Sequence, residues 1–131
     1  MITYLYIGLG SALGGMARHG ISTWMALRFP GAFPWGTLLV NVLGSFLIGL
    51  IVSLPESRWA GAERGLMRQF LTIGFLGGFT TFSAFSIQTV SLAQIGKAPA
   101  SLLYILLSVM LCLAAAALGY FCATGSWAPK P

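Results

Sequence analysis

Acidic side chains are almost absent from this sequence, which contains two glutamates and no aspartate among its 131 residues. Glu56 and Glu63 both fall in one polar connection between apolar segments. General acid–base and nucleophilic catalysis need ionisable groups held close together, and the apolar segments offer no Ser/His/Asp arrangement. We therefore predict that the protein is not an enzyme.

Cysteine and histidine are also scarce, with two cysteines and one histidine. Cys112 and Cys122 fall in the same apolar segment, about 15 Å apart along a helix axis, so they cannot form a disulfide within one chain. His19 has no neighbouring cluster of metal ligands. We expect no transition-metal site.

Charged residues make up only 7% of the chain, and the seven cations are scattered singly. They are Arg18, Arg28, Arg58, Arg64, Arg68, Lys97 and Lys130. A nucleic-acid-binding surface needs its cations clustered in a patch or stripe. We therefore predict no nucleic-acid partner and interpret the cations as residues that flank membrane segments.

Apolar residues are abundant instead: 57% of the chain is hydrophobic and its mean hydropathy is +0.88. A membrane-spanning helix takes about 20 residues, so the chain has room for roughly four spans and short connections. The predicted spans are Ile2 to Leu27, Trp35 to Leu54, Arg68 to Ala93 and Ser101 to Cys122. We therefore predict an all-α integral membrane protein, in which residues 1–131 form a single four-helix unit in the lipid bilayer.

The predicted spans distribute the cations almost evenly between the two sides of the membrane. The side of the N-terminus, the second connection and the C-terminus carries Arg58, Arg64, Arg68 and Lys130. The other side carries Arg28 and Lys97, with Arg18 near its edge. Because Lys and Arg set orientation and glutamates contribute little, we predict that the chain inserts both ways. Two oppositely oriented copies can then pair as an antiparallel homodimer.

The stretch from Gly74 to Ser86 combines glycines, hydroxyls and aromatic rings within the third predicted span. Paired glycines and β-branched threonines weaken a helix. Backbone groups freed at membrane depth are tolerated only where protein or a polar cavity satisfies them. We therefore predict that the third helix is broken here, at a site for an ion or substrate.

Neutral hydrogen-bonding groups form three stripes at helical spacing. The stripes are Thr37, Asn41 and Ser45 on the second span, Thr81, Phe85 and Gln88 on the third, and Tyr104, Ser108 and Cys112 on the fourth. Residues four apart share one helix face, so the three stripes can line one path. The alternative is that they hydrogen-bond between helices and only hold the bundle together.

Phe82 and Phe85 are three residues apart on the same expected helix. An aromatic ring carries a positive edge, so a ring turned edge-on to a polar path favours an anion without supplying a full counter-charge. Together with the Asn41 amide and nearby hydroxyls, these edges can replace water around a small anion. The more ordinary interpretation is that the two rings face lipid or the protein core.

At these residues the sequence resembles the Fluc family of fluoride channels, also called CrcB proteins. The matching pieces are Gly14-Gly15-Met16-Ala17-Arg18, Gly36-Thr37-Leu38-Leu39-Val40-Asn41-Val42-Leu43-Gly44 and the whole Gly74 to Ser86 segment. The resemblance covers all four predicted spans, from about Gly8 to Phe121.

The resemblance implies a dual-topology antiparallel homodimer with two fluoride pores, in the inner membrane of a bacterial cell. Its role would be passive export that lowers cytoplasmic fluoride. Asn41, Phe82 and Phe85 match the family's pore positions, and Arg18 matches a basic residue near the aqueous vestibule. The other residues expected along the pore are Thr37, Thr81, Gln88, Tyr104 and Ser108.

The resemblance also implies a structural sodium ion at the dimer centre, which is not transported. Its ligands would be the backbone carbonyls of Gly77 and Thr80 from both subunits. Carbonyls released where a helix unwinds are suitable ligands for an alkali cation. The helix break follows from the residues themselves, whereas the identity of the ion follows from the resemblance.

The sequence departs from the family pattern at two positions. Gln88 stands where we expect glutamate. The amide has nearly the same size as the carboxyl group and can form hydrogen bonds, but it carries no charge and does not titrate. This change bears on the conduction rate and not on the fold. Ala84 stands where a hydroxyl residue is common, which removes one possible pore donor.

The main alternative is a small dual-topology drug or cation exporter, which would share the chain length, four spans and weak charge bias. A carboxylate within the membrane normally marks proton coupling, and every predicted span lacks Asp and Glu. A third interpretation is a non-transporting scaffold, in which the polar stripes only hold helices together. The aromatic and glycine segment favours the channel over both.

Overall fold

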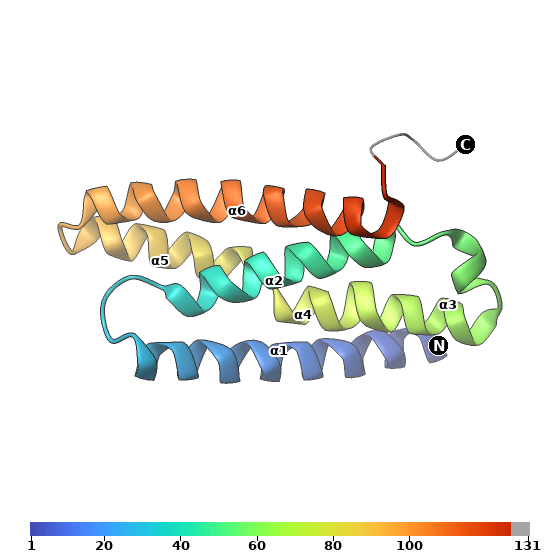
Figure 1. Ribbon diagram of the computed structural model, residues 1–131. Helices are drawn as coiled ribbons and strands as arrows, with labels where there is room; N and C mark the ends of the chain where they lie inside the picture. Colours follow the sequence, from blue (N-terminus) through green and yellow to red (C-terminus); the bar gives the residue numbers. More distant parts are fainter. Residues whose placement is uncertain (127–131) are drawn as a thin grey trace.

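The computed structural model describes residues 1–126, and these residues form a helical bundle without strands (Figure 1). Its helices are α1 (Ile2–Arg28), α2 (Trp35–Val52), η1 (Glu56–Trp59), α3 (Ala62–Gln69), η2 (Phe70–Leu76), α4 (Gly77–Phe79), α5 (Phe82–Gln94) and α6 (Ala98–Thr124). The prediction of an all-α chain is confirmed for this range. Lys130, which was counted in the prediction of orientation, lies outside the described residues.

Within the described residues, three helical stretches are long and apolar enough to cross a membrane. They are Trp35–Val52, Ala62–Gln94 and Ala98–Thr124. Helix α1 has 27 residues but is more polar, since it carries Arg18, His19 and Arg28. Several membrane-capable helices are therefore present, and the fourth span stays a prediction.

The helix ends follow local sequence signals. Helix α1 ends at Arg28, whose charge complements the negative end of the helix dipole, just before Pro30. Helix α6 has a proline in its first turn and ends at Gly125, which adopts a left-handed conformation with φ of 67°. The third helical run begins at Ala62 rather than at Arg68, because α3 is a polar extension of the apolar segment.

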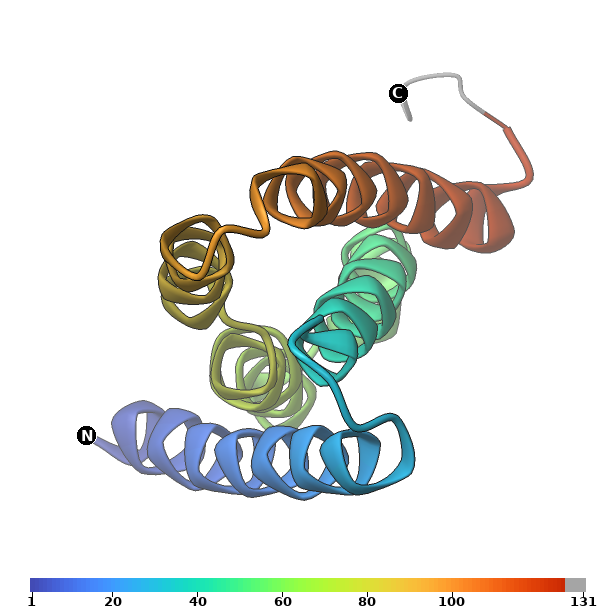
Figure 2. The same ribbon diagram turned by 90° about the vertical axis from the view of Figure 1, so that its left-hand side faces the viewer.

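Close contacts between helices depend on glycine. Helix α2 packs along α6, where a side chain at Gly49 would overlap the Ala116 carbonyl oxygen. Helix α1 packs on η2 and α4, where a side chain at Gly14 would overlap the Phe75 carbonyl oxygen. Figure 2 shows α1 and α6 on opposite sides, with α2 and the third helical run between them.

The third helical run is irregular at its centre. Residues Phe70–Leu76 form a π-helix, which the sequence did not predict. Thr80 and Thr81 are extended, with ψ of 157° and 114°, and separate α4 from α5. The interruption therefore lies at the end of the expected Gly77 to Thr80 break and extends one residue further, while Gly77 remains helical. The Thr81 side chain explains this position, because it caps α5 by accepting a hydrogen bond from the Ala84 amide at 3.2 Å.

The two ends of the bundle carry different charged residues. Residue 1, the connection after α2 and the end of α6 share one end, where Arg68 pairs with Glu56 at 2.9 Å (Figure 1). The opposite end holds two connections, residues 29–34, which follow Arg28, and residues 95–97, which end at Lys97. These ends correspond to the two sides predicted from the sequence.

Candidate functional site

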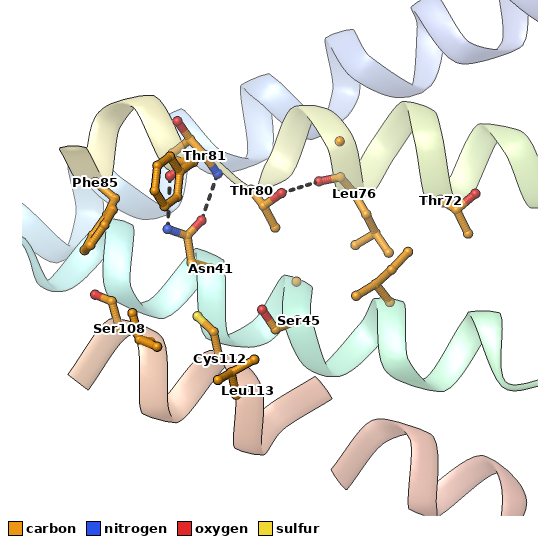
Figure 3. Close-up of a pocket in the computed structure, with 15 residues that line it drawn as sticks. Asn41, Ser45, Thr72, Leu76, Thr80, Thr81, Phe85, Ser108, Cys112 and Leu113 are labelled. Atoms are coloured by element: carbon orange, nitrogen blue, oxygen red, sulfur yellow. Dashed lines mark hydrogen bonds between the residues drawn. The ribbon is translucent and has the colours of Figure 1, made fainter. Parts of the chain in front are cut away.

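A cavity of about 450 Å³ opens beside the interruption, between α2, the third helical run and α6 (Figure 3). Its lining brings together seven of the predicted site residues: Asn41, Gly77, Thr80, Thr81, Phe82, Phe85 and Ser108. Ser45 and Cys112, from the predicted polar stripes, also line it. Every side chain in the lining is uncharged. Two members of each predicted stripe therefore meet at one neutral cavity, and Thr37, Gln88 and Tyr104 lie outside its lining.

Asn41 bridges from α2 to the interrupted backbone (Figure 3). Its Nδ2 donates to the Thr81 carbonyl oxygen at 3.1 Å, and the Thr81 amide donates to its Oδ1 at 2.8 Å. One side-chain amide thus pairs with both backbone groups of an extended residue. Because an asparagine amide carries two N–H groups, one donor of Asn41 is available beyond the bond to Thr81.

The hydroxyls of the cavity differ in whether they can donate a hydrogen bond to a species inside it. Thr80 Oγ1 donates to the Leu76 carbonyl oxygen at 2.9 Å, so the proton of that hydroxyl is already used in a hydrogen bond to the backbone. Ser108 is only 6% exposed, and its hydroxyl lies near that of Tyr104 without making a hydrogen bond of good geometry within the described residues. A buried hydroxyl without a partner costs about 1–3 kcal/mol. Ser108 is therefore a donor that a polar species in the cavity can satisfy.

A second cavity of about 250 Å³ contains the predicted residues Thr37 and Gln88. Tyr104 is fully buried, and its hydroxyl donates to Gln88 Oε1 at 3.1 Å. The ring of Tyr104 lies 5.2 Å from that of Phe85, centroid to centroid. Phe85 lines the first cavity and Gln88 lines the second, so Tyr104, which contacts both residues, links the two cavities.

The two predicted pore phenylalanines occupy different environments. Phe85 is 9% exposed and belongs to the core, whereas Phe82 is 77% exposed. Their ring centroids are 5.3 Å apart. Phe82 therefore borders the cavity at the surface of a single chain, and its predicted role requires a second wall from another subunit.

Arg18 lies at the contact between α1 and α4. Its Nε donates to the Gly78 carbonyl oxygen at 3.1 Å, and the residue is partly buried. In an unbroken helix that carbonyl would accept from the amide of Phe82. Arg18 therefore stabilises the interruption from outside the first cavity, and its role in a vestibule stays a prediction.

The carbonyl groups of Gly77 and Thr80 lose their helical donors at the interruption. In a continuous helix they would accept from the amides of Thr81 and Ala84. Those amides donate instead to Asn41 Oδ1 and to Thr81 Oγ1. The two carbonyl oxygens are therefore suited to a hard cation, which is the chemistry that the predicted sodium site needs.

Sequence reasoning missed several residues of the cavity wall, including Thr72 and Gly44. Thr72 lines the cavity from the π-helix, although its hydroxyl donates to the Arg68 carbonyl oxygen at 2.8 Å. Gly44 lies against Thr80, and a side chain at Gly44 would overlap the Thr80 methyl group. The position of Gly44, about one turn beyond Asn41 on the same helix, is the signal that could have indicated this contact.

Comparison with known proteins assigns the chain to a family. The family model described as CrcB-like protein, Camphor Resistance (CrcB), matches residues 5–120. This chain belongs to the CrcB family. The resemblance inferred from the sequence motifs is thereby confirmed.

Relatives of this CrcB-family chain share one name, fluoride-specific ion channel FluC. The relative from Thermus thermophilus is 48% identical over 89% of this chain and 90% of its own length. The relative from Opitutus terrae is 46% identical over 95% of both chains. The relative from Paramagnetospirillum magneticum is 45% identical over 95% of this chain and 97% of its own.

These names describe channels, which agrees with the prediction that the protein is not an enzyme. With its apolar helices, the CrcB-family chain is a multi-pass membrane protein.

Proposed function

We propose that this chain is a fluoride-selective ion channel. The observation that carries the proposal is the set of relatives named fluoride-specific ion channel, which are 45–48% identical over nearly the whole chain. The channel would act passively, letting fluoride leave the cell down its gradient. Its physiological effect would be a lower cytoplasmic fluoride concentration.

The chemistry of the larger cavity supports this function. Fluoride is a small, strongly hydrated anion, so a path must replace its water with donors. Asn41 has one free N–H, Ser108 has a hydroxyl without a hydrogen bond of good geometry, and Phe85 has a polarised ring edge. A fixed cation in this lining would hold the anion tightly, whereas neutral donors allow it to leave.

The two cavities suggest the course of the path. An ion passing from Asn41 would pass Phe85 and Tyr104 and reach the cavity of Thr37 and Gln88. Gln88 accepts from Tyr104 through Oε1, so its two amide N–H groups remain as donors. A neutral glutamine at this place supplies donors without repelling the anion.

The working unit we propose is an antiparallel dual-topology homodimer with two pores in the inner membrane, with α1 as the fourth span. Two exposed features of the single chain support a partner beside the interruption. Phe82 is 77% exposed, and a Cβ at Gly77 would meet only open space. Labelling of an introduced loop cysteine from only one face of the membrane would contradict mixed orientation.

Purified protein in liposomes is expected to release trapped fluoride, measured with a fluoride electrode, while trapped chloride is retained. The selectivity follows from a narrow neutral path that offers few donors to the larger anion. Equal release of both anions would indicate a nonselective pore. Release of neither anion would favour the non-transporting scaffold. Uptake of organic cations in the absence of fluoride would favour the exporter.

Sodium removal tests the proposed structural ion, which the carbonyls of Gly77 and Thr80 would hold. Replacing sodium with an impermeant organic cation is expected to lower fluoride efflux or dimer stability, because the freed carbonyls then lack a counter-charge. A sodium gradient imposed across the liposome should not drive fluoride. Unchanged efflux and unchanged dimer stability after thorough depletion would contradict the site, and flux that follows the gradient would indicate coupled transport.

A further inference from the structure

An open cleft of about 490 Å³ lies at the opposite end of the bundle from the two glutamates. It adjoins the cavity of Thr37 and Gln88, with which it shares Phe29, Gly31, Ala32, Phe33 and Trp35. Arg28, at the end of α1, and Lys97, before α6, both line it. Glu56 and Glu63 are the only acidic side chains in the sequence, and both belong to the other end. The two cations of the cleft therefore have no acidic side chain within the subunit to neutralise them.

Two helix N-termini reinforce the positive potential of this cleft. Trp35 begins α2 and Ala100 lies in the first turn of α6, and both residues line the cleft. Neither helix has a side-chain cap on its first-turn amides. The N-terminus of a helix carries a partial positive charge and unsatisfied N–H groups. The Trp35 amide donates to the Phe33 carbonyl oxygen at 3.0 Å, and Pro99 in the first turn of α6 has no N–H. The two helix ends therefore contribute mainly their dipoles, beside the two side-chain cations.

The position of the cleft along the apolar helices fits the level where a membrane meets water. The membrane-capable stretches Trp35–Val52 and Ala98–Thr124 both begin here. Phe29 and Trp35 line the cleft and are 51% and 43% exposed, which is typical of an aromatic belt at the headgroup level. Leu27 and Ile95, beside the two cations in sequence, are 79% and 60% exposed. Apolar surface suited to acyl chains therefore adjoins a cationic pocket.

We infer that this cleft binds the headgroup phosphate of an anionic phospholipid, with Arg28 and Lys97 contacting the phosphate from its two sides. Basic pockets between membrane helices commonly bind such headgroups. A phospholipid with net negative charge, such as phosphatidylglycerol, should be preferred over phosphatidylcholine, because the choline group of the latter offsets the phosphate. The inference depends on the position of the cleft in the bilayer and does not depend on which ion the protein conducts.

Native mass spectrometry of the purified protein, titrated with phosphatidylglycerol or phosphatidylcholine, tests the site. The protein is expected to bind phosphatidylglycerol more tightly. The double variant Arg28→Gln/Lys97→Gln should lose about thirtyfold in affinity for that lipid, and each single variant about fivefold. Phosphatidylcholine binding should stay unchanged. The matched control is Arg58→Gln/Arg64→Gln, which removes two cations from the opposite end and should keep the preference.

Two further arms make the result decisive. The charge-retaining variant Arg28→Lys/Lys97→Arg should keep most of the affinity, and circular dichroism should show native helix content in all variants. Excess inorganic phosphate should fail to displace the lipid. Displacement by inorganic phosphate would overturn the inference in favour of a free-anion site. An equal loss in the Arg58→Gln/Arg64→Gln control, or no loss in the single and double variants, would overturn it as well.

Discussion

Fluoride efflux is expected to fall about a thousandfold when Asn41 is replaced by aspartate. The substitution preserves shape but replaces Nδ2, which donates to the Thr81 carbonyl at 3.1 Å, with a carboxylate oxygen. That oxygen would face the carbonyl without a donor between them. It would also place a negative charge in a lining that is otherwise neutral. At an effective dielectric constant near 20, two like charges about 4 Å apart repel by about 4 kcal/mol, which corresponds to this loss.

The Asn41→Asp measurement is fluoride efflux from liposomes, with a size-exclusion profile to confirm assembly. The matched control is Gln94→Glu, which makes the same chemical change at an exposed position at the end of α5. Efflux in that control should remain close to that of the unmodified protein. Near-normal flux in a properly assembled Asn41→Asp protein would show that the anion does not pass this amide.

Seven of the predicted site residues line one cavity, but the sequence did not predict how they are arranged. Periodicity placed Thr37, Asn41 and Ser45 on one helix face, which suggested a single path. The structure divides the stripe, with Asn41 and Ser45 at one cavity and Thr37 at another. A repeat of four residues identifies a face but not which larger side chain fills the space along it. Here Tyr104 is fully buried and contacts both Phe85 and Gln88.

The irregular backbone of the third helical run was predictable only in part. Glycine and threonine composition predicted a break within Gly74 to Ser86, because these residues weaken a helix, and the extended residues Thr80 and Thr81 fall in this stretch. The reciprocal pairing of Asn41 with Thr81 could not be predicted, since the two residues are 40 positions apart. The π-helix from Phe70 to Leu76 also escaped prediction. Its apolar pattern does not distinguish i→i+4 from i→i+5 hydrogen bonding.

The predicted role of Arg18 illustrates a similar limit. The resemblance placed Arg18 near an aqueous vestibule, which stays a prediction, whereas the structure shows its Nε donating to the Gly78 carbonyl oxygen. Sequence alone could not show that the guanidinium satisfies a carbonyl of α4, because the contact spans two helices. The packing of α1 on α4 therefore determines the partner of Arg18.

Replacing Phe82 or Phe85 with isoleucine is expected to lower fluoride efflux about a hundredfold while leaving assembly intact. Isoleucine keeps apolar bulk but removes the polarised ring edge that favours an anion. If each edge contributes as much as a hydrogen bond to a charged group, up to about 3 kcal/mol, the loss is on this scale. Efflux from liposomes and the size-exclusion profile are measured for each variant. The matched control is Phe121→Ile, on the exposed side of α6, which should conduct normally.

Phe82→Ile is the more discriminating of the two substitutions, because the surroundings of the rings differ. Phe85 is buried against Tyr104, so its replacement also disturbs packing in the core. Phe82 is 77% exposed on the single chain, so the same replacement costs little stability within the subunit. A lipid-facing ring would tolerate isoleucine, and only a ring edge turned to the path explains a large loss of flux. Normal flux in both variants would rule out the ring-edge mechanism, and normal flux in Phe82→Ile alone would leave Phe85 as the single aromatic pore residue.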